Sequence, residues 1–160
     1  DGILQQVYND QIKQKELVDV AIKRRLTETR DTKGKLEEHL NQVLKEKSNL
    51  EDTIHNLQTA IENKKETLQL AETRTDIRKG RPNIENRIDP AQFRLLEEIN
   101  EIRTDMKELG RRLADSHSSM KGLTRRQFDL EEDITIKSNS IFIDEVQCQG
   151  IRESLNIKSW

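Results

Sequence analysis

The sequence predicts an all-α protein whose long coiled-coil helices form an antiparallel helical hairpin or part of an elongated helix bundle. Of its 160 residues 36% are charged, 32% hydrophobic and 3% aromatic, so large apolar side chains are too few to fill a compact core. The apolar residues nevertheless keep a heptad period, which a disordered segment has no reason to do. A stretch rich in helix breakers, residues 76–90, separates two heptad runs.

The first predicted helix spans residues 1–79. Nine of its eleven clearest seam positions are apolar, and the exceptions are two lysines whose aliphatic stems can lie along a seam. These positions are Leu36, Leu40, Val43, Lys47, Leu50, Ile54, Leu57, Ile61, Lys64, Leu68 and Ala71. Upstream of them, the apolar residues between Leu4 and Val20 fit no single register. We therefore expect a continuous helix whose apolar stripe is shifted there.

We predict that residues 80–90 form a loop at which the chain turns. Gly80 suits a left-handed position that ends the first helix. Asp89 and Pro90 suit the N-cap and the first position of the second helix. The two seams are also out of phase, because Leu36 and Leu95 are separated by 59 residues, which is eight heptads plus three. The second helix therefore does not simply continue the first.

The second predicted helix spans residues 91–140, and ten of its twelve seam positions are apolar. The seam consists of Leu95, Ile99, Ile102, Met106, Leu109, Leu113, Ser116, Met120, Leu123, Gln127, Leu130 and Ile134. We expect this helix to fray near residues 137–140. Residues 141–160 form a short C-terminal segment in this reading, and its first part, 141–150, either continues the helix or packs as an extended piece.

Composition argues against several classes of function. The 28 basic and 30 acidic residues give a formal net charge of -2, whereas nucleic-acid binding favours a basic excess. Basic pairs such as Arg111-Arg112 are interleaved with acids and are interpreted as solvated helix faces. The longest apolar run, Ile141–Ile143, is too short to cross a membrane. The chain begins with Asp1 rather than Met, and we expect it to be a piece of a longer protein.

No catalytic or metal-binding pattern is recognisable. The single cysteine, Cys148, excludes an intramolecular disulfide framework and a cysteine-based zinc cluster. The histidines His39, His55 and His117 lie far apart, and no catalytic motif accompanies them. The sequence therefore predicts a protein that is not an enzyme and that needs no cofactor or metal.

The loop resembles the signature nonapeptide of the tektins, Arg-Pro-Asn-Val-Glu-Leu-Cys-Arg-Asp. The matching residues are Arg81, Pro82, Asn83, Glu85 and Asp89, with Ile84 in place of Val, while Asn86, Arg87 and Ile88 depart from the pattern. The family's loop cysteine is thus absent, which puts any thiol role of the loop in doubt. Residues 71–74, 92–95 and 139–144, with Cys148, also fall where a tektin would have them.

The resemblance implies a structural, filament-forming protein of cilia and flagella. It would polymerise end to end in the lumen of the A-tubule of axonemal doublet microtubules and stiffen them. Its implied partners are tubulin, other tektin molecules and other microtubule inner proteins, with no nucleic acid and no membrane. Two alternatives from the residues stay open: a generic cytoskeletal scaffold or adaptor outside the axoneme, and a parallel dimer like that of intermediate filaments.

Two sets of residues are candidates for contacts with such partners. The loop either only permits a hairpin or acts as a docking element, through Arg81, Pro82, Asn83, Ile84, Glu85, Asn86, Arg87 and Asp89. A rigid loop bounded by prolines loses less entropy on binding than a flexible one. The second set either packs on the helix pair or forms a longitudinal contact with the next molecule, and it consists of Ile141, Phe142, Ile143, Asp144 and Cys148.

Overall fold

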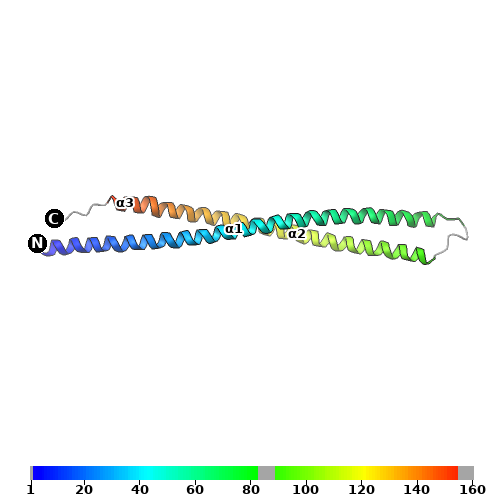
Figure 1. Cartoon of the computed structure of the whole chain (residues 1–160), viewed down its shortest axis with the longest axis horizontal. Coiled ribbons are helices and arrows are strands. Elements are labelled where there is room, and N and C mark those ends of the chain that lie inside the picture. Colours follow the sequence, from blue (N-terminus) through cyan, green and yellow to red (C-terminus); the bar gives the residue numbers. More distant parts are fainter. Residues whose placement is uncertain (1, 83–88, 155–160) are drawn as a thin grey trace. The chain divides into compact units, whose positions relative to one another are not determined.

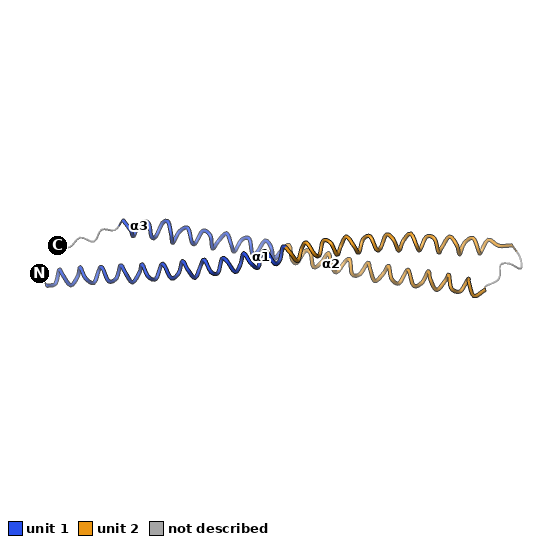
Figure 2. The backbone as a smooth tube through the Cα atoms, in the orientation of Figure 1, with its two compact units in different colours: residues 1–44, 125–160 blue, residues 45–124 orange. Residues whose placement is uncertain are grey.

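The computed structural model describes residues 2–82 and 89–154. Its elements follow in the order α1 (Gly2–Lys79), α2 (Pro90–Phe142), the π-helical segment η2 (Ile143–Gln149) and α3 (Gly150–Glu153) (Figure 1). The chain divides into two compact units (Figure 2): unit 1 takes residues 1–44 and 125–160, and unit 2 takes residues 45–124. Both long helices contribute to both units, and each unit is described below by itself.

In unit 2 the second part of α1 and the first part of α2 are antiparallel neighbours. Glu72 accepts a hydrogen bond from Arg103 at 2.8 Å, and Lys64 donates one to Asp105 at 2.7 Å. Partner positions on α2 rise as those on α1 fall, which is the order of an antiparallel pair. The predicted antiparallel hairpin is confirmed, and a straight continuation of α1 into α2 is excluded.

Unit 1 repeats the antiparallel arrangement with the first part of α1. The side chains of His39 and Arg126 meet at 2.8 Å. Further along, Asp19 accepts a hydrogen bond from Arg152 of α3 at 2.6 Å. Residues 141–153 are helical, and the contact of Arg152 with Asp19 places them against α1. This decides between the two possibilities left open for residues 141–150.

The predicted seams are the faces at which the helices meet. Every seam position predicted on either helix is buried or half-buried, including the two lysines of α1 and the polar Ser116 and Gln127 of α2. The heptad pattern was therefore a sufficient guide to the packing face wherever it was regular.

The expected shift of the stripe in the first part of α1 is wrong. The half-buried or buried positions continue upstream with unbroken heptad spacing: Tyr8, Ile12, Lys15, Asp19, Ile22, Leu26, Thr29 and Lys33. Leu17, Val18 and Val20 are instead exposed. A continuous helix keeps its phase even where several inward positions are polar, because packing of the residues on either side fixes its rotation.

Two expected helix ends also differ from the structure. Gly80 does not adopt a left-handed conformation; the end of α1 tightens instead, with the N–H of Gly80 bonded to the carbonyl of Asp76 and that of Arg81 to the carbonyl of Arg78. The second helix does not fray at residues 137–140. It runs to Phe142, and helical backbone continues through η2 and α3. The hydroxyls of Ser138 and Ser140 bond to carbonyls one turn earlier in the helix.

The core is narrow. Among the described residues the buried apolar side chains are Leu26, Val43, Ala71, Ile99, Ile102 and Leu130. Most other seam residues are only half-buried, because two helices cover just one side of each other's apolar stripe. The hairpin thus leaves part of its seam accessible to further helices. Within the described residues, no helix is long and apolar enough to cross a membrane.

Candidate interaction sites

The first candidate site is the loop end of unit 2, where Asp89 begins α2. Its carboxylate Oδ1 accepts a hydrogen bond from the backbone N–H of Gln92 at 2.8 Å, and its carbonyl accepts from the N–H groups of Gln92 and Phe93. This is the geometry of an N-cap, and Pro90 follows as the first residue of the helix. The predicted start of the second helix is confirmed.

Arg78 joins the two sides of the loop. Its Nη2 donates to both carboxylate oxygens of Asp89, at 2.6 Å to Oδ1, and its Nε donates to the side-chain carbonyl of Gln92 at 3.1 Å. The Arg78 side chain is largely buried. Arg78 was not among the residues predicted from the sequence, although it occupies the next heptad position after Ala71 and Thr75. A basic residue on a seam beside a loop was the available signal.

Of the predicted interaction loop, the structure describes Arg81, Pro82 and Asp89. Arg81 and Pro82 are exposed, whereas Asp89 is half-buried and engaged by Arg78 and Gln92. Asn83, Ile84, Glu85, Asn86 and Arg87 lie outside the described residues. Asp89 therefore fixes the loop's base, and Arg81 is the described side chain with both the charge and the exposure for an external contact.

The contacts of the Asp89 carboxylate with Gln92 and Arg78 should make the stability of unit 2 sensitive to acid. The pKa of the Asp89 carboxyl is lowered, first by the backbone N–H of Gln92 and then by Arg78. Its stabilising effect is therefore complete above the ordinary value of 3.8 and is lost as the pH falls through the lowered folded-state value. Arg78→Met should move the Asp89 pKa upwards but not fully to its ordinary value, because the Gln92 bond remains. NMR titration of the Asp89 carboxyl measures its pKa in the unmodified chain and in the Arg78→Met variant.

The control is Lys79→Met, which removes a neighbouring charge that pairs with Asp76 rather than with Asp89. It should leave the Asp89 titration nearly unchanged. Equal shifts in the two variants would mean that general positive charge, and not the Arg78 contact, holds the carboxylate ionised.

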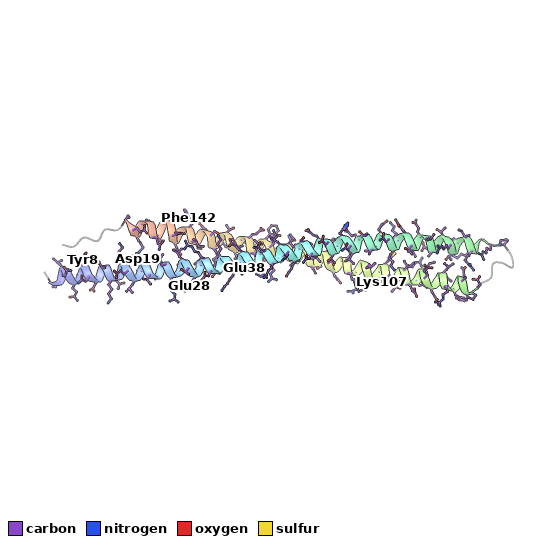
Figure 3. All side chains as sticks on the ribbon, in the orientation of Figure 1. Tyr8, Asp19, Glu28, Glu38, Lys107 and Phe142 are labelled. Carbon is purple, nitrogen blue, oxygen red and sulfur yellow. The ribbon has the colours of Figure 1, made fainter. Side chains whose placement is uncertain are left out.

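The second candidate site is the C-terminal part of unit 1, and the structure separates its five predicted residues. Phe142 and Ile143 are exposed, Ile141 and Cys148 are half-buried, and Asp144 is buried. Asp144 lies against α1, where its Oδ2 is 3.0 Å from Nε of Arg25. Figure 3 labels Phe142 on α2 and Asp19 on α1 among the side chains of this unit. The outward members, Phe142 and Ile143, are the ones placed for an external contact.

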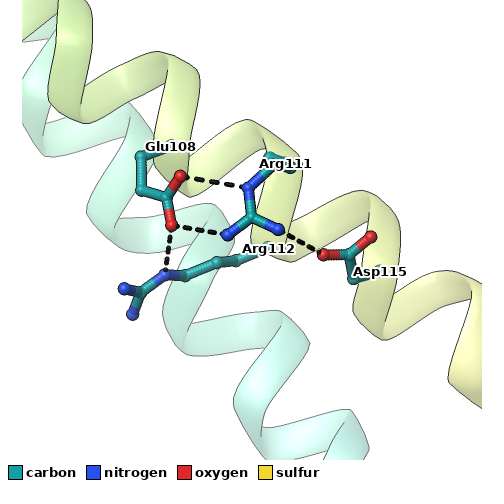
Figure 4. A network of polar contacts seen from close by, with 4 residues as sticks. All are labelled: Glu108, Arg111, Arg112 and Asp115. Atoms are coloured by element: carbon teal, nitrogen blue, oxygen red, sulfur yellow. Dashed lines mark hydrogen bonds and ion pairs between the residues drawn. The ribbon is translucent and has the colours of Figure 1, made fainter.

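A separate cluster of charged side chains lies on the surface of α2. Glu108 accepts hydrogen bonds from Arg111 and Arg112, and Arg111 also bonds Asp115 (Figure 4). The hydrogen bonds from Arg111 and Arg112 lower the pKa of Glu108 to about 2. Arg111, Arg112 and Asp115 are exposed, and Glu108 is half-buried. The basic pair is thus balanced by acids on its own helix, as expected for a solvated face.

No group of three or more histidine, cysteine, aspartate or glutamate side chains in the described part of the chain could hold a metal ion. Each unit consists of paired helices with an apolar seam and charged outer faces. These features define an α-helical coiled-coil structural protein.

Comparison with known proteins identifies the family. The model of the tektin family matches residues 1–156. Tektin-4 of Bos taurus is 40% identical over 152 residues, which cover 95% of this chain and 34% of that protein. Tektin-4 of Rattus norvegicus is 37% identical and that of Homo sapiens 36% identical over the same length. The chain belongs to the tektin family of cytoskeletal structural proteins. It spans about a third of the length of these relatives.

Proposed function

We propose that this chain is a rod segment of a filament protein that polymerises end to end in the lumen of the A-tubule of axonemal doublet microtubules and stiffens cilia or flagella. The observation that carries the proposal is the family match over nearly the whole chain, joined to the antiparallel pairing of two long helices within each unit. Residues 1–79 and 91–140 are the rod segments, and residues 80–90 and 141–160 are the parts that make specific contacts.

The surface chemistry supports binding along a length rather than at one point. Exposed ion pairs occur along both helices, from Arg24–Glu28 to Arg111–Asp115. Each exposed pair contributes only about 0.2–1 kcal/mol, so a partner must be held by many repeated contacts. Tubulin, other tektin molecules and other microtubule inner proteins are partners of this repetitive kind. The half-buried seams also fit a bundle in which additional helices cover the hairpin.

The proposed localisation is tested by imaging. The full-length protein, carrying a small tag, is expressed in ciliated cells, and isolated doublets are examined by cryo-electron tomography. We expect rod-like density on the inner wall of the A-tubule that disappears when the gene is deleted. Density confined to the outside of the doublet, or no association with the axoneme, would overturn the proposal and favour a scaffold elsewhere in the cytoskeleton.

The docking role of the loop predicts a charge-reversal effect. Arg81→Glu in the full-length protein should reduce incorporation into axonemes severalfold, because it places a negative charge where the proposed acidic partner lies. The measurement is the ratio of axonemal to soluble protein after detergent extraction. Arg125→Glu, at another exposed arginine, is the matched control and should incorporate normally. Equal incorporation of both variants would show that Arg81 has no docking role and that the loop only connects the two helices.

The exposed residues Phe142 and Ile143 are proposed to contribute a longitudinal contact with the next molecule, together with the part of Ile141 and Cys148 that remains accessible. Asp144 supports this contact from behind by holding the segment on α1. An exposed apolar group of this kind is stabilised when a partner covers it.

A further inference from the structure

The helical phase changes in the C-terminal segment of unit 1. The four-and-three spacing of Leu130 and Ile134 gives as the next inward positions Lys137, Ile141, Asp144, Cys148 and Ile151. The first four of these are buried or half-buried as the spacing requires. Ile151 is not, because its side chain is 66% exposed. Its neighbour Arg152 faces α1 instead.

The π-helical segment η2, Ile143–Gln149, lies where this change occurs. A π-helix bonds residue i to i+5, so each of its turns takes one more residue than an α-helical turn. A seam that passes through it is therefore delayed by about one residue. That delay exchanges the expected inward residue, Ile151, for Arg152.

Polar contacts with α1 match the delayed phase. Arg152 Nε donates to Oδ1 of Asp19 at 2.6 Å, and its Nη2 donates to the carbonyl of Lys15 at 3.1 Å. Asp19 is itself an inward position of α1 in its unbroken heptad. A small cavity of about 140 Å³ beside this pair has only polar residues in its wall: Lys15, Asp19, Lys23, Gln149, Arg152 and Glu153. The place that an unshifted helix would give to Ile151 is thus polar.

A second contact lies within η2. Asp144 is 91% hidden from solvent, and its Oδ2 forms an ion pair with Nε of Arg25 at 3.0 Å, without hydrogen-bond geometry. The next residue, Glu145, pairs with Arg30 at 2.7 Å. Buried polar groups stabilise a seam less than apolar ones, but they can select one alignment because other alignments leave them unpaired.

We propose that η2 is a phase-shifting device. It turns Arg152 towards α1 and Ile151 away from it, and the Asp19–Arg152 pair holds the segment in that rotation. The same rotation adds Ile151 to the exposed apolar residues of the segment, which include Phe142 and Val146. The device thereby determines which side chains this end of the chain presents to its surroundings. It does not depend on the proposed filament function, because every contact in it lies within one chain.

The phase is tested by maleimide labelling of the 160-residue chain, in a Cys148→Ser background that keeps both Asp19 and Arg152. One variant carries Ile151→Cys, and the matched variant carries Gln149→Cys. We expect the thiol at 151 to react severalfold faster, because Ile151 is 66% exposed whereas Gln149 is half-buried. Faster reaction of the thiol at 149, or equal rates, would show an uninterrupted α-helical seam and overturn the proposal.

The holding role of Asp19 has its own test, with Ile151→Cys alone as the reporter. In the shifted phase this thiol is exposed and reacts quickly with a maleimide. Asp19→Ala should slow the reaction severalfold, because without its partner Arg152 no longer keeps residue 151 outside. Asp10→Ala, at an exposed acid earlier on α1, should not change it. An unchanged labelling rate in Asp19→Ala would show that the Asp19–Arg152 pair does not hold the segment in its rotation.

Discussion

Leu26→Ala should lower the free energy of unfolding by about 2–3 kcal/mol, the largest loss that we expect from a single substitution in this chain. Leu26 is 4% exposed, and truncating it removes apolar burial and leaves a gap in the seam of unit 1. The estimate is at the low end for buried leucines because a helix pair can close around a small gap more easily than a globular core. Urea unfolding followed by circular dichroism measures the change.

Leu17→Ala is the matched control. The residue type, the helix and the unit are the same, but Leu17 is 55% exposed. Its truncation should change the free energy of unfolding by no more than about 0.5 kcal/mol. If both variants lose the same stability, the heptad phase assigned to the first part of α1 is incorrect.

This pair of leucines also shows how far the sequence could predict the fold. From Leu36 to Ala71 and from Leu95 to Ile134 the seam was readable, because apolar residues occupy the inward positions at regular spacing. Before Leu36 the rule holds at Ile22 and Leu26 but fails at other positions, in both directions. Leu17 and Val20 are apolar but exposed, and Lys15 and Asp19 are charged but inward. A sequence pattern assigns the inward positions from residue type alone. In a long continuous helix, the inward positions of an irregular part are instead fixed by the packing of the regular part that follows it.

The contact sites were predictable to a smaller extent. The cap at Asp89 followed from local chemistry, since a carboxylate before a proline at the first helical position needs no tertiary information. Arg78 was missed because its partners, Asp89 and Gln92, are brought to it only when the chain reverses. The π-helical segment could not be predicted either, because the residue types at 143–149 are equally compatible with an α-helix. In the proposed phase shift, the distinguishing contact is the one that Arg152 makes with Asp19 of α1.

Replacing Gly110 and Gly122 together by alanine should raise the free energy of unfolding by about 1–2 kcal/mol. Both glycines lie inside α2 and are exposed, and a Cβ added at either would meet nothing within 4 Å. Alanine stabilises a helix interior by about 0.5–1 kcal/mol relative to glycine. The two sites are three turns apart and share no partner, so their effects should add.

The mirror-image control for the glycine prediction is Ala114→Gly, at an exposed position between the two glycines. It should lower stability by about 0.5–1 kcal/mol through the same loss of helix propensity. Chemical denaturation of the three proteins would place them in the order double-alanine variant, unmodified chain, Ala114→Gly. A double-alanine variant no more stable than the unmodified chain would mean that α2 bends or breaks at these glycines. Their lack of a side chain would then serve the packing of a further helix against α2, since backbone approaches most closely where no Cβ intervenes.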